Sequence, residues 1–599
     1  MRQRTQNSCH CSNTVAMILR FFHVLALLAS TTTAFVGTRR GASRPAILCS
    51  RTGRGREEIF VLGASAKSKS YDECDVAVMG GGFGGLYTAL TISREAKKKG
   101  KNVSVALVDP SDRFVFLPLL YDLSMGTASE GEVCPTYKEL LEGSGVRYIK
   151  ASFDGFSKSA GNYNGPSEAM LTPVSKQKYP EDEECGDIIH LSFDAAVVAV
   201  GATPQSILAS IPGASEFAQP FYTKDDAYAT REVLFQMDQK VRQGESPRIA
   251  VVGGGYGGVE LSACVARRLP KASVTMMSRG PPMAGTKAEP LVEQALKNLG
   301  VHCEINNVKE IQRKESNKFT IRRSSRSDSD RDLNIGEDDL WDAVLWTAGS
   351  GPANPVANDV GCELAMSSSG RLRVDKSLRC CFKEKISDDA TPASQPNSKP
   401  KLSSVWALGD CSEIVPALQP ATPRTAQAAM QQADVVASNV LAKISNREGD
   451  PKAFEFQDLG SVLSLGGPNA AILGPGEDSQ LGPLFVPLLD TARAGLGVAD
   501  SIFAGIINSP QIDKNGDLKP VVKNLGLSLG GYGLGVDPET TPGTLSGTLS
   551  GAGRRAIYAL RMPTNKQRAY AGASAFLSSA LALAKEASDQ IESNNDKRR

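Results

Sequence analysis

The stretch Gly80-Gly-Gly-Phe-Gly-Gly85 follows a short strand expected over 75–79 and precedes a helical pattern over 86–99. Gly80, Gly82 and Gly85 match a G-x-G-x-x-G turn between a strand and a helix. The first glycine permits a tight turn, the second lets a pyrophosphate approach the backbone, and the third lets the helix pack closely. The helix N-terminus then faces the phosphates with its partial positive charge. The pattern predicts a dinucleotide-binding turn.

An acid stands at the end of the strand that follows this helix. Asp109 comes directly after the second strand, which is expected over 103–108. A carboxylate there can accept hydrogen bonds from a ribose diol, as the dinucleotide-binding fold requires. A glycine turn with a purely structural role is the alternative, and the strand, helix and acid together argue against it.

The same pattern occurs again in Gly253-Gly-Gly-Tyr-Gly-Gly258, after the strand-like run 248–252. Gly253, Gly255 and Gly258 take the three glycine positions. Two dinucleotide sites in one chain indicate that electrons pass between two cofactors.

The second turn differs from the first in what ends the next strand. Ser278 and Arg279 stand where an acid would be expected. A carboxylate would repel the 2′-phosphate of NADPH, whereas Arg279 could bind it through charge-assisted hydrogen bonds, and Ser278 could add a neutral one. We predict that NADPH is preferred, with NADH as a possible co-substrate. The alternative is that Arg279 is only a solvated residue at a strand end.

A third motif, Trp406-Ala-Leu-Gly-Asp410, makes the chain resemble the flavoprotein superfamily with two dinucleotide-binding domains. In that superfamily the glycine and aspartate, here Gly409 and Asp410, close the FAD site. The resemblance implies an α/β fold with two Rossmann-like domains, the FAD domain being interrupted by the NAD(P)H domain. It assigns FAD to the first turn and NADPH to the second.

Within the superfamily, the chain resembles the type II NAD(P)H:quinone oxidoreductases, and specifically the plastid branch of the demethylphylloquinone reductase type. The segment 113–121, which begins with Arg113, matches the family segment after the first acid. Gln427 and Gln431 match a helix that borders the quinone near the flavin, and Glu260 matches a glutamate near the nicotinamide. Helix capping or surface amides are the alternative for the glutamines, and bracing of the turn is the alternative for Glu260.

One absence points to the route of the electrons. Disulfide reductases of the superfamily carry a close cysteine pair soon after the first turn, but here the first cysteine after it, Cys134, stands alone. We therefore expect electrons to leave the flavin directly. The net charge of +2 argues against a nucleic-acid partner, and only four histidines occur, so no metal site is expected.

The first 56 residues contain arginines but neither Asp nor Glu, and they include the short apolar run 21–29. A basic segment followed by an apolar run too short to span a bilayer is typical of a targeting sequence. The order resembles a bipartite plastid presequence, with secretion and mitochondrial import as alternatives. We expect a thylakoid surface or a plastoglobule as the destination.

We predict a presequence over 1–70, the FAD domain over 71–245 and 351–445, the NAD(P)H domain over 246–350, and a C-terminal region over 446–599. The C-terminal region combines a Gly-rich insertion, 476–553, with a helical pattern over 569–590. Basic residues precede that helix, which suits a peripheral helix on an anionic membrane or lipid-body surface. Packing on the protein body or at a homodimer interface is the alternative. The basic residues are Arg554, Arg555, Arg561, Lys566 and Arg568.

Together these features predict an FAD-dependent enzyme that passes electrons from NADPH or NADH to a membrane prenylquinone such as demethylphylloquinone or plastoquinone, without proton pumping. Two alternatives stay open. One is an NADPH-binding flavoprotein with a redox-sensing or structural role. The other is a reductase whose acceptor is a protein.

Overall fold

The computed structural model describes residues 70–157, 167–174, 188–203, 208–325, 339–353, 364–382, 402–418, 421–446, 449–466, 469–473, 510–512, 518–520, 544–575 and 577. The predicted presequence lies outside these residues apart from Ser70, and the helix expected over 569–590 is described only as far as 577.

The first sheet is built around β1 (Ser70–Met79), which pairs in parallel with β2 (Val105–Asp109) and β5 (Ile189–Val198). β3 (Val146–Phe156) extends the sheet beyond β2, and β17 (Leu402–Ala407) extends it beyond β5, both in parallel. Val76 to Met79 are fully buried, as expected for a central parallel strand covered on both faces.

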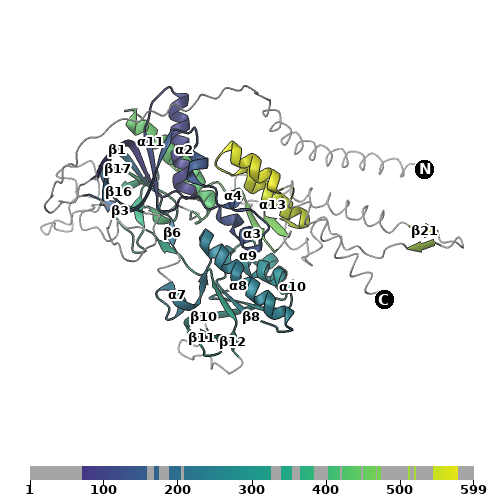
Figure 1. Cartoon of the computed structure of the whole chain (residues 1–599). Coiled ribbons are helices and arrows are strands. Elements are labelled where there is room, and N and C mark those ends of the chain that lie inside the picture. Colours follow the sequence, from purple (N-terminus) through teal and green to yellow (C-terminus); the bar gives the residue numbers. More distant parts are fainter. Residues whose placement is uncertain are drawn as a thin grey trace, which may run out of the picture. The chain divides into compact units, whose positions relative to one another are not determined.

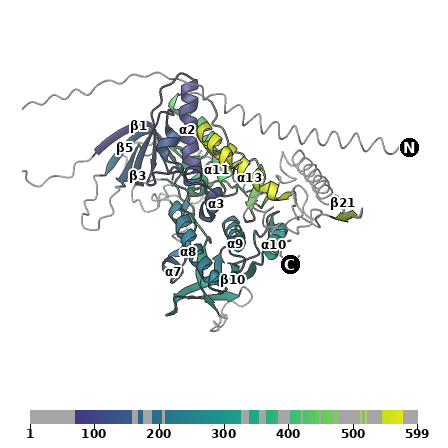
Figure 2. The same ribbon diagram turned by 45° about the vertical axis from the view of Figure 1, so that its right-hand side comes forward.

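Antiparallel strands complete this sheet. β4 (Glu168–Pro173) pairs with both β3 and β5, and β16 (Arg379–Cys381) pairs with β17. β15 (Leu372–Val374) follows β16, and β18 (Ser412–Ile414) forms the edge. Helices α2 (Phe83–Lys98) and α11 (Ala426–Ile444) pack against each other beside the sheet (Figures 1 and 2).

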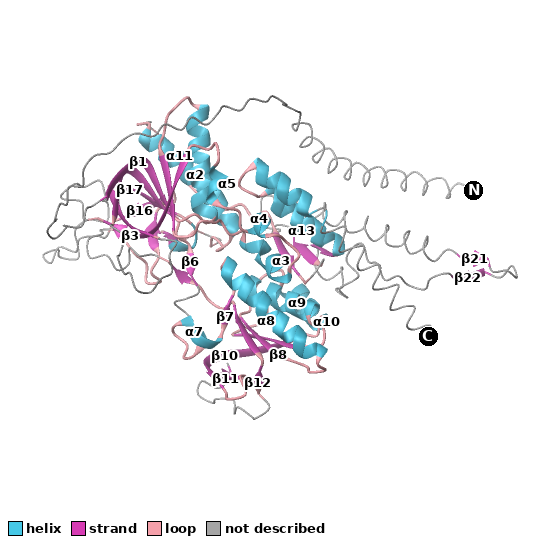
Figure 3. Cartoon of the chain, viewed as in Figure 1, coloured by secondary structure: helices cyan, strands magenta, loops and turns pink. Residues whose placement is uncertain are grey.

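The second sheet is built around β8 (Arg248–Val252), with β9 (Ser273–Ser278) and β13 (Ala343–Trp346) as its parallel neighbours. β10 (His302–Arg313) and β7 (Gln219–Pro220) extend the parallel part. Two antiparallel strands and four helices complete this part of the molecule (Figure 3). They are β11 (Phe319–Ser325), β12 (Leu340–Trp341), α7 (Ala214–Phe217), α8 (Lys224–Arg242), α9 (Tyr256–Arg268) and α10 (Glu289–Asn298).

The chain enters and leaves the second sheet through a short antiparallel ribbon of β6 (Ala202–Thr203) and β14 (Gly351–Pro352). Each sheet therefore has its own strand, glycine turn and helix. The predicted α/β fold with two Rossmann-like units is confirmed.

Short helices connect β2 to β3 in the first unit. They are η1 (Leu117–Leu119), α3 (Leu120–Met125), α4 (Glu130–Val133) and α5 (Tyr137–Leu141), and the turn η3 (Gly409–Cys411) follows β17. Thr136 caps α5 through a capping box with Glu139.

The C-terminal part adds a three-stranded sheet of β19 (Ser461–Ser464), β20 (Ala470–Leu473) and β23 (Thr544–Gly547). Helix α13 (Thr548–Leu560) follows, and residues 565–575 are helical as well. A separate hairpin joins β21 (Pro510–Ile512) and β22 (Leu518–Pro520). No helix among the described residues is both long and apolar enough to cross a membrane.

Candidate functional site: two dinucleotide turns and a buried charge cluster

The first glycine turn leaves no room for side chains on its protein side. Gly80 has a φ of +98°, and a Cβ there would lie 2.4 Å from the carbonyl oxygen of Ala199. A Cβ on Gly85 would lie 1.8 Å from the carbonyl oxygen of Gly80. At Gly82, by contrast, no protein atom lies within 4 Å of the Cβ position. This open side, at the start of α2, is where a pyrophosphate would bind.

Asp109 is held at this turn by backbone hydrogen bonds. Its Oδ2 accepts the N–H of Gly81 at 2.6 Å, and its Oδ1 accepts the N–H of Ser111 at 2.8 Å. Burial raises the pKa of Asp109 to about 6, against the opposing effect of the hydrogen bonds from Gly81, Ser111 and Tyr137. The carboxyl is thus fixed beside the turn, in the position that a ribose-binding acid requires.

Arg113, the other residue predicted to bind the cofactor in this segment, has protein partners. Its Nη1 donates to the carbonyl oxygen of Cys134 at 2.9 Å and forms an ion pair with Glu130 at 3.0 Å. These contacts tie the loop after β2 to α4. Its predicted contact with FAD stays a prediction.

Gly409 and Asp410 border a cavity beside the N-terminal end of α11. Gly409 donates its N–H to Oε1 of Gln432 at 2.7 Å, and the buried Arg371 donates to the carbonyl oxygen of Asp410 at 3.0 Å. Burial raises the pKa of Asp410, while Arg424 and Arg371 oppose the rise. The cavity lining is completed by residues including Ser412, Thr425, Ala428 and Ala429.

The second turn repeats the steric pattern of the first. Gly253 has a φ of +133°, and a Cβ there would lie 2.3 Å from Oγ1 of Thr347. A Cβ on Gly258 would lie 1.8 Å from the carbonyl oxygen of Gly253, whereas the Cβ position of Gly255 is open. This turn therefore also presents an unobstructed backbone at the start of a helix, α9.

Ser278 lies against this turn with its hydroxyl already engaged. Its Oγ donates to the carbonyl oxygen of Gly280 at 2.7 Å, and a Cβ on Gly254 would lie 2.7 Å from the Cβ of Ser278. Ser278 would have to give up the bond to Gly280 before it could donate to a phosphate. Arg279 is exposed and has no hydrogen bond or ion pair within the described parts of the chain. Of the two residues, Arg279 is the better placed to bind a 2′-phosphate.

Gln427 and Gln431, predicted to contact a quinone, both hold the backbone of segment 457–460. Gln431 donates to the carbonyl oxygen of Gln457 at 2.8 Å and accepts the N–H of Gln457 at 2.9 Å. Gln427 donates to the carbonyl oxygen of Gly460 at 3.2 Å. The two amides share one face of α11, as expected for residues one helical turn apart. Their contact with a quinone stays a prediction.

Glu260 is buried on α9 at the junction of three parts of the molecule. Its Oε1 accepts the N–H of Ser464 in β19 at 2.8 Å, and the Tyr121 hydroxyl of α3 faces the same carboxyl. Burial raises the pKa of Glu260 to about 7, although the Ser464 N–H and the nearby Arg554 guanidinium oppose the rise. Its carboxyl can therefore bind or release a proton near neutral pH.

Two of the five basic residues predicted to face a membrane are instead buried. Arg554 is 2% exposed, and its Nη2 donates to both carboxylate oxygens of Asp122 at 2.9 Å. Arg555 donates to Glu132 at 2.7 Å and to the carbonyl oxygen of Thr127 at 2.9 Å. The membrane role predicted for Arg554 and Arg555 is therefore wrong. Both arginines fasten α13 to α3 and α4, because carboxylates buried there require cations.

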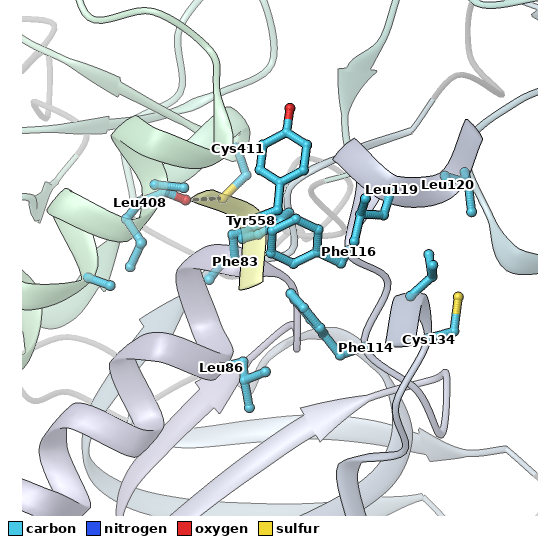
Figure 4. Packing of buried hydrophobic residues seen from close by; sticks show 14 of the residues in the cluster. Phe83, Leu86, Phe114, Phe116, Leu119, Leu120, Cys134, Leu408, Cys411 and Tyr558 are labelled. Carbon is cyan, nitrogen blue, oxygen red and sulfur yellow. Dashed lines mark hydrogen bonds between the residues drawn. The ribbon is translucent and has the colours of Figure 1, made fainter. Parts of the chain in front are cut away.

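Aromatic residues from distant segments pack together between these elements (Figure 4). Phe83 of α2 contacts Phe114 and Phe116 edge to face, with ring centroids 5.1 and 5.2 Å apart. Tyr558 of α13 packs on Phe116, with ring centroids 5.6 Å apart.

Burial raises the pKa of the nearby Cys134 thiol to about 12, which makes it a poor nucleophile.

The sequence did not identify several residues that shape these sites. Asp122 and Glu132 lie in short helices without a recognisable motif, and Tyr121 ends the matched segment 113–121 without having been singled out. Gln432 directly follows the predicted Gln431, and only its burial and its bond to Gly409 reveal its role. The motif Ala-Gln-x-x-x-Gln identifies Gln427 and Gln431, but it gives no sign that the next residue, Gln432, is the one that binds Gly409.

Comparisons with known proteins agree with this geometry. Residues 74–433 match the pyridine nucleotide-disulphide oxidoreductase family. The chain is 30% identical over 407 residues to the alternative NAD(P)H-ubiquinone oxidoreductase C1, chloroplastic/mitochondrial, of Arabidopsis thaliana, with 66% of this chain and 72% of the relative covered. It is also 30% identical over 406 residues to the demethylphylloquinone reductase NdbB of Synechocystis, with 67% of this chain and 87% of the relative covered.

A solved structure shares the fold. The structure of NDH2 from Plasmodium falciparum in complex with NADH aligns with a TM-score of 0.52 at 17% identity, and covers 70% of this chain and 94% of that one. The chain therefore belongs to the pyridine nucleotide-disulphide oxidoreductase family and, within it, to the type II NAD(P)H:quinone oxidoreductases, which confirms the resemblance found in the sequence.

Proposed function

We propose that this protein is an FAD-dependent enzyme that passes electrons from NADPH to a membrane prenylquinone, without pumping protons. The observation that carries the proposal is the pair of open glycine turns with unlike partners. Asp109 is held at the first turn, and Ser278 and Arg279 stand at the second. Bound FAD can take a hydride from NADPH and deliver the electrons to an acceptor.

Each turn has the shape that its ligand needs. Gly82 and the N-terminus of α2 would hold the FAD pyrophosphate, Asp109 would accept the ribose hydroxyls, and Asp410 would border the flavin side. Gly255 and the N-terminus of α9 would hold the NADPH pyrophosphate, with Arg279 on the 2′-phosphate.

Glu260 supplies a proton-binding group beside the second turn. Because Oε1 already accepts the N–H of Ser464, the proton that this carboxyl binds near neutral pH would sit on Oε2. Quinone reduction consumes protons, and a carboxyl with a pKa near 7 is well matched to donating one.

The experiment that tests the function is NADPH oxidation by the purified, FAD-loaded protein with a panel of benzo- and naphthoquinones. We expect turnover with at least one prenylquinone analogue and little consumption of NADPH without a quinone. Flavin bleaching by NADPH without quinone turnover would favour the redox-sensing alternative. Turnover with a ferredoxin or rubredoxin but no quinone would favour a protein acceptor.

The quinone contact is tested at α11. Gln427→Leu should slow reoxidation of the reduced flavin by quinone while leaving its reduction by NADPH unchanged. Gln294→Leu on α10, which also removes a half-buried glutamine amide, serves as the control. Unchanged reoxidation by quinone in Gln427→Leu would exclude this helix as the quinone site.

We infer a plastid location from the predicted presequence and from the two relatives, one named chloroplastic/mitochondrial and the other cyanobacterial. The thylakoid surface or a plastoglobule is the proposed destination. Exposed apolar residues on the C-terminal helices support attachment to a lipid surface. Leu560 is 65% exposed, Tyr570 49% and Leu577 61%, with Lys566 and Arg568 exposed nearby.

A further inference from the structure

The buried charges around Glu260 do not balance within the described residues. Arg554 pairs with Asp122 at 2.9 Å, and Arg555 pairs with Glu132 at 2.7 Å and makes a longer contact of 3.9 Å with Asp122. Glu260 is left as a third carboxyl without a cation of its own. The charge of Glu260 therefore depends closely on how the Arg554–Asp122 pair beside it is held.

Arg554 is built into this place by several contacts. Its guanidinium bonds both oxygens of Asp122, its Nη1 donates to the carbonyl oxygen of Pro118 at 3.3 Å, and it lies over the Tyr558 ring with 5.6 Å to the centroid. A bidentate arginine fork fixes its partner in orientation as well as in position. Arg554 thereby fixes η1 and α3 from the far end of the chain.

Helix α3 in turn reaches the second dinucleotide turn. Tyr121, the neighbour of Asp122, stacks on Phe221 with ring centroids 5.0 Å apart. Its hydroxyl lies 3.5 Å from the Cβ position of Gly257 and faces the Glu260 carboxyl. A continuous series of contacts thus connects Arg554, through Asp122 and Tyr121, with the second glycine turn.

We propose that Arg554 is a positioning residue of the electron-transfer site, which holds α3 so that Tyr121 lies against Glu260 and the second glycine turn. The proposal rests on the proposed function, because it gives the C-terminal helix a role in that same site. Helix α13 belongs to neither dinucleotide motif, and the proposal gives it a role in the binding and oxidation of NADPH.

The groups that act on Glu260 come from α3, α9, β19 and α13, and their charges determine the expected pH dependence. They are Tyr121 and Asp122 from α3, Tyr256 and Cys264 from α9, Ser464 from β19, and Arg554 and Tyr558 from α13. Arg554 is the one cation in this set. Its removal leaves Asp122 negative beside Glu260, and both changes favour the protonated form of Glu260.

Arg555 provides a matched control on the same helix. It is also an arginine, is also buried, and also pairs with a buried carboxylate. Its hydrogen-bonded partner Glu132 belongs to α4, and its contact with Asp122 is longer, at 3.9 Å. Neither Arg555 nor Glu132 is among the groups that shift the pKa of Glu260 most. A purely structural role for α13 predicts that Arg554→Met and Arg555→Met behave alike.

The test compares Arg554→Met, Arg554→Lys and Arg555→Met, each FAD-loaded, by the pH profile of NADPH-driven flavin reduction and by titration with NADPH. Arg554→Met should move the midpoint near pH 7 upward by roughly one unit and weaken NADPH binding several-fold. Arg554→Lys should restore most of the midpoint because it restores the charge. Arg555→Met should change neither measurement, whatever its melting temperature.

Two further measurements keep the outcome clear. Arg554→Met/Asp122→Asn removes the pair without leaving a buried charge, and it should fold even where the single variant does not. In that double variant NADPH binding should still be weakened, because α3 has lost its anchor. Equal profiles for Arg554→Met and Arg555→Met, or wild-type profiles for both, would overturn the proposal. Neither readout needs a quinone, so absence of quinone turnover would count against the proposed function alone.

Discussion

At the scale of single residues, the two glycine turns differ in one hydrogen bond. In the first turn the Gly81 N–H donates to Asp109, whereas in the second the Ser278 hydroxyl donates to Gly280 instead. The first turn thus holds a carboxylate that could accept hydrogen bonds from ribose hydroxyls. The second has no acid at the end of β9, and it leaves the exposed Arg279 available.

Arg279→Glu tests this difference. The substitution should lower the ratio of kcat/KM for NADPH to that for NADH by roughly 10- to 100-fold, because charge-assisted hydrogen bonds contribute about 1.5–3 kcal/mol each. Lys271→Glu makes the same charge change before the opposite end of β9 and should leave the ratio unchanged. An unchanged ratio in Arg279→Glu would refute the assignment of NADPH to this residue.

The glycines of one turn should respond unequally to the same added methyl group. Gly82→Ala places a Cβ in open space, so the apoprotein should fold normally but bind FAD poorly. Gly85→Ala forces a Cβ to within 1.8 Å of the Gly80 carbonyl oxygen, so it should destabilise the fold itself. The FAD-to-protein absorbance ratio and thermal melting of the apoproteins measure the two effects. Normal FAD content in Gly82→Ala would show that the pyrophosphate does not lie on this side.

Glu260→Gln should show, through the pH dependence of the free energy of unfolding, what it costs to bury the charged Glu260 carboxylate. The folded protein raises the pKa of Glu260 from 4.5 to about 7, so between these values the folded state binds more protons than the unfolded state. Wild-type stability should therefore fall relative to Glu260→Gln as pH rises across this window, by up to about 3 kcal/mol, and then level off. Denaturant titrations of both proteins from pH 4 to 8 provide the comparison, and parallel curves would contradict it.

Much of the site could be predicted from the sequence, because the glycines of each dinucleotide turn lie within six consecutive residues. Gly80, Gly82, Gly85 and Asp109 are linked by a strand and a helix of standard length. Tyr121 and Asp122 could not be found in this way, because their partners come from α9 and α13. No local pattern marks a carboxylate whose cation lies 432 residues further along the chain.

At the scale of elements, α13 is fixed by ion pairs as much as by apolar packing. In the helical segment 565–575 that follows α13, Gln567 donates to the carbonyl oxygen of Gly131 at 2.7 Å. The basic residues before the C-terminal helix favoured a membrane-facing surface, with packing on the protein body or at a homodimer interface as the alternative. That inference failed for Arg554 and Arg555 because sequence alone does not show which arginines have buried partners.

Arg555→Met measures how strongly this element is attached. The change leaves Glu132, which is 1% exposed, without its cation, and should lower the free energy of unfolding by about 3 kcal/mol or more. Arg555→Met/Glu132→Gln should recover a large part of the loss, since no uncompensated charge stays buried. Denaturant unfolding gives both values. A single variant as stable as the wild type would mean that the ion pair does not form.

At the scale of the whole molecule, the C-terminal part carries both the proposed positioning residue Arg554 and the proposed lipid contact. Leu560 and Leu577 are exposed, whereas Arg554 and Arg555 lie inside. Deleting everything after residue 552 would remove both features together. Point substitutions on the exposed face separate them.

Leu560→Glu/Leu577→Glu should abolish flotation with anionic liposomes while leaving NADPH-driven flavin reduction intact, because apolar burial in the lipid is lost but the ion pairs are kept. Phe235→Glu, at a residue 53% exposed on α8, controls for loss of any exposed apolar group. Sedimentation of the same proteins tests the competing use of this face as a homodimer interface. Undiminished flotation of the double variant would place the membrane contact elsewhere.

The long sequence separation of the two ion pairs, 432 and 423 residues, also bears on how the protein is made. A growing chain completes both glycine turns and their sheets long before Arg554 and Arg555 leave the ribosome. Until then Asp122 and Glu132 have no cation to accompany them into the interior, and burial of lone carboxylates is costly. If Arg554 positions the nucleotide site as proposed, an incomplete chain would lack a finished site, and the precursor would not consume NADPH before its synthesis ends.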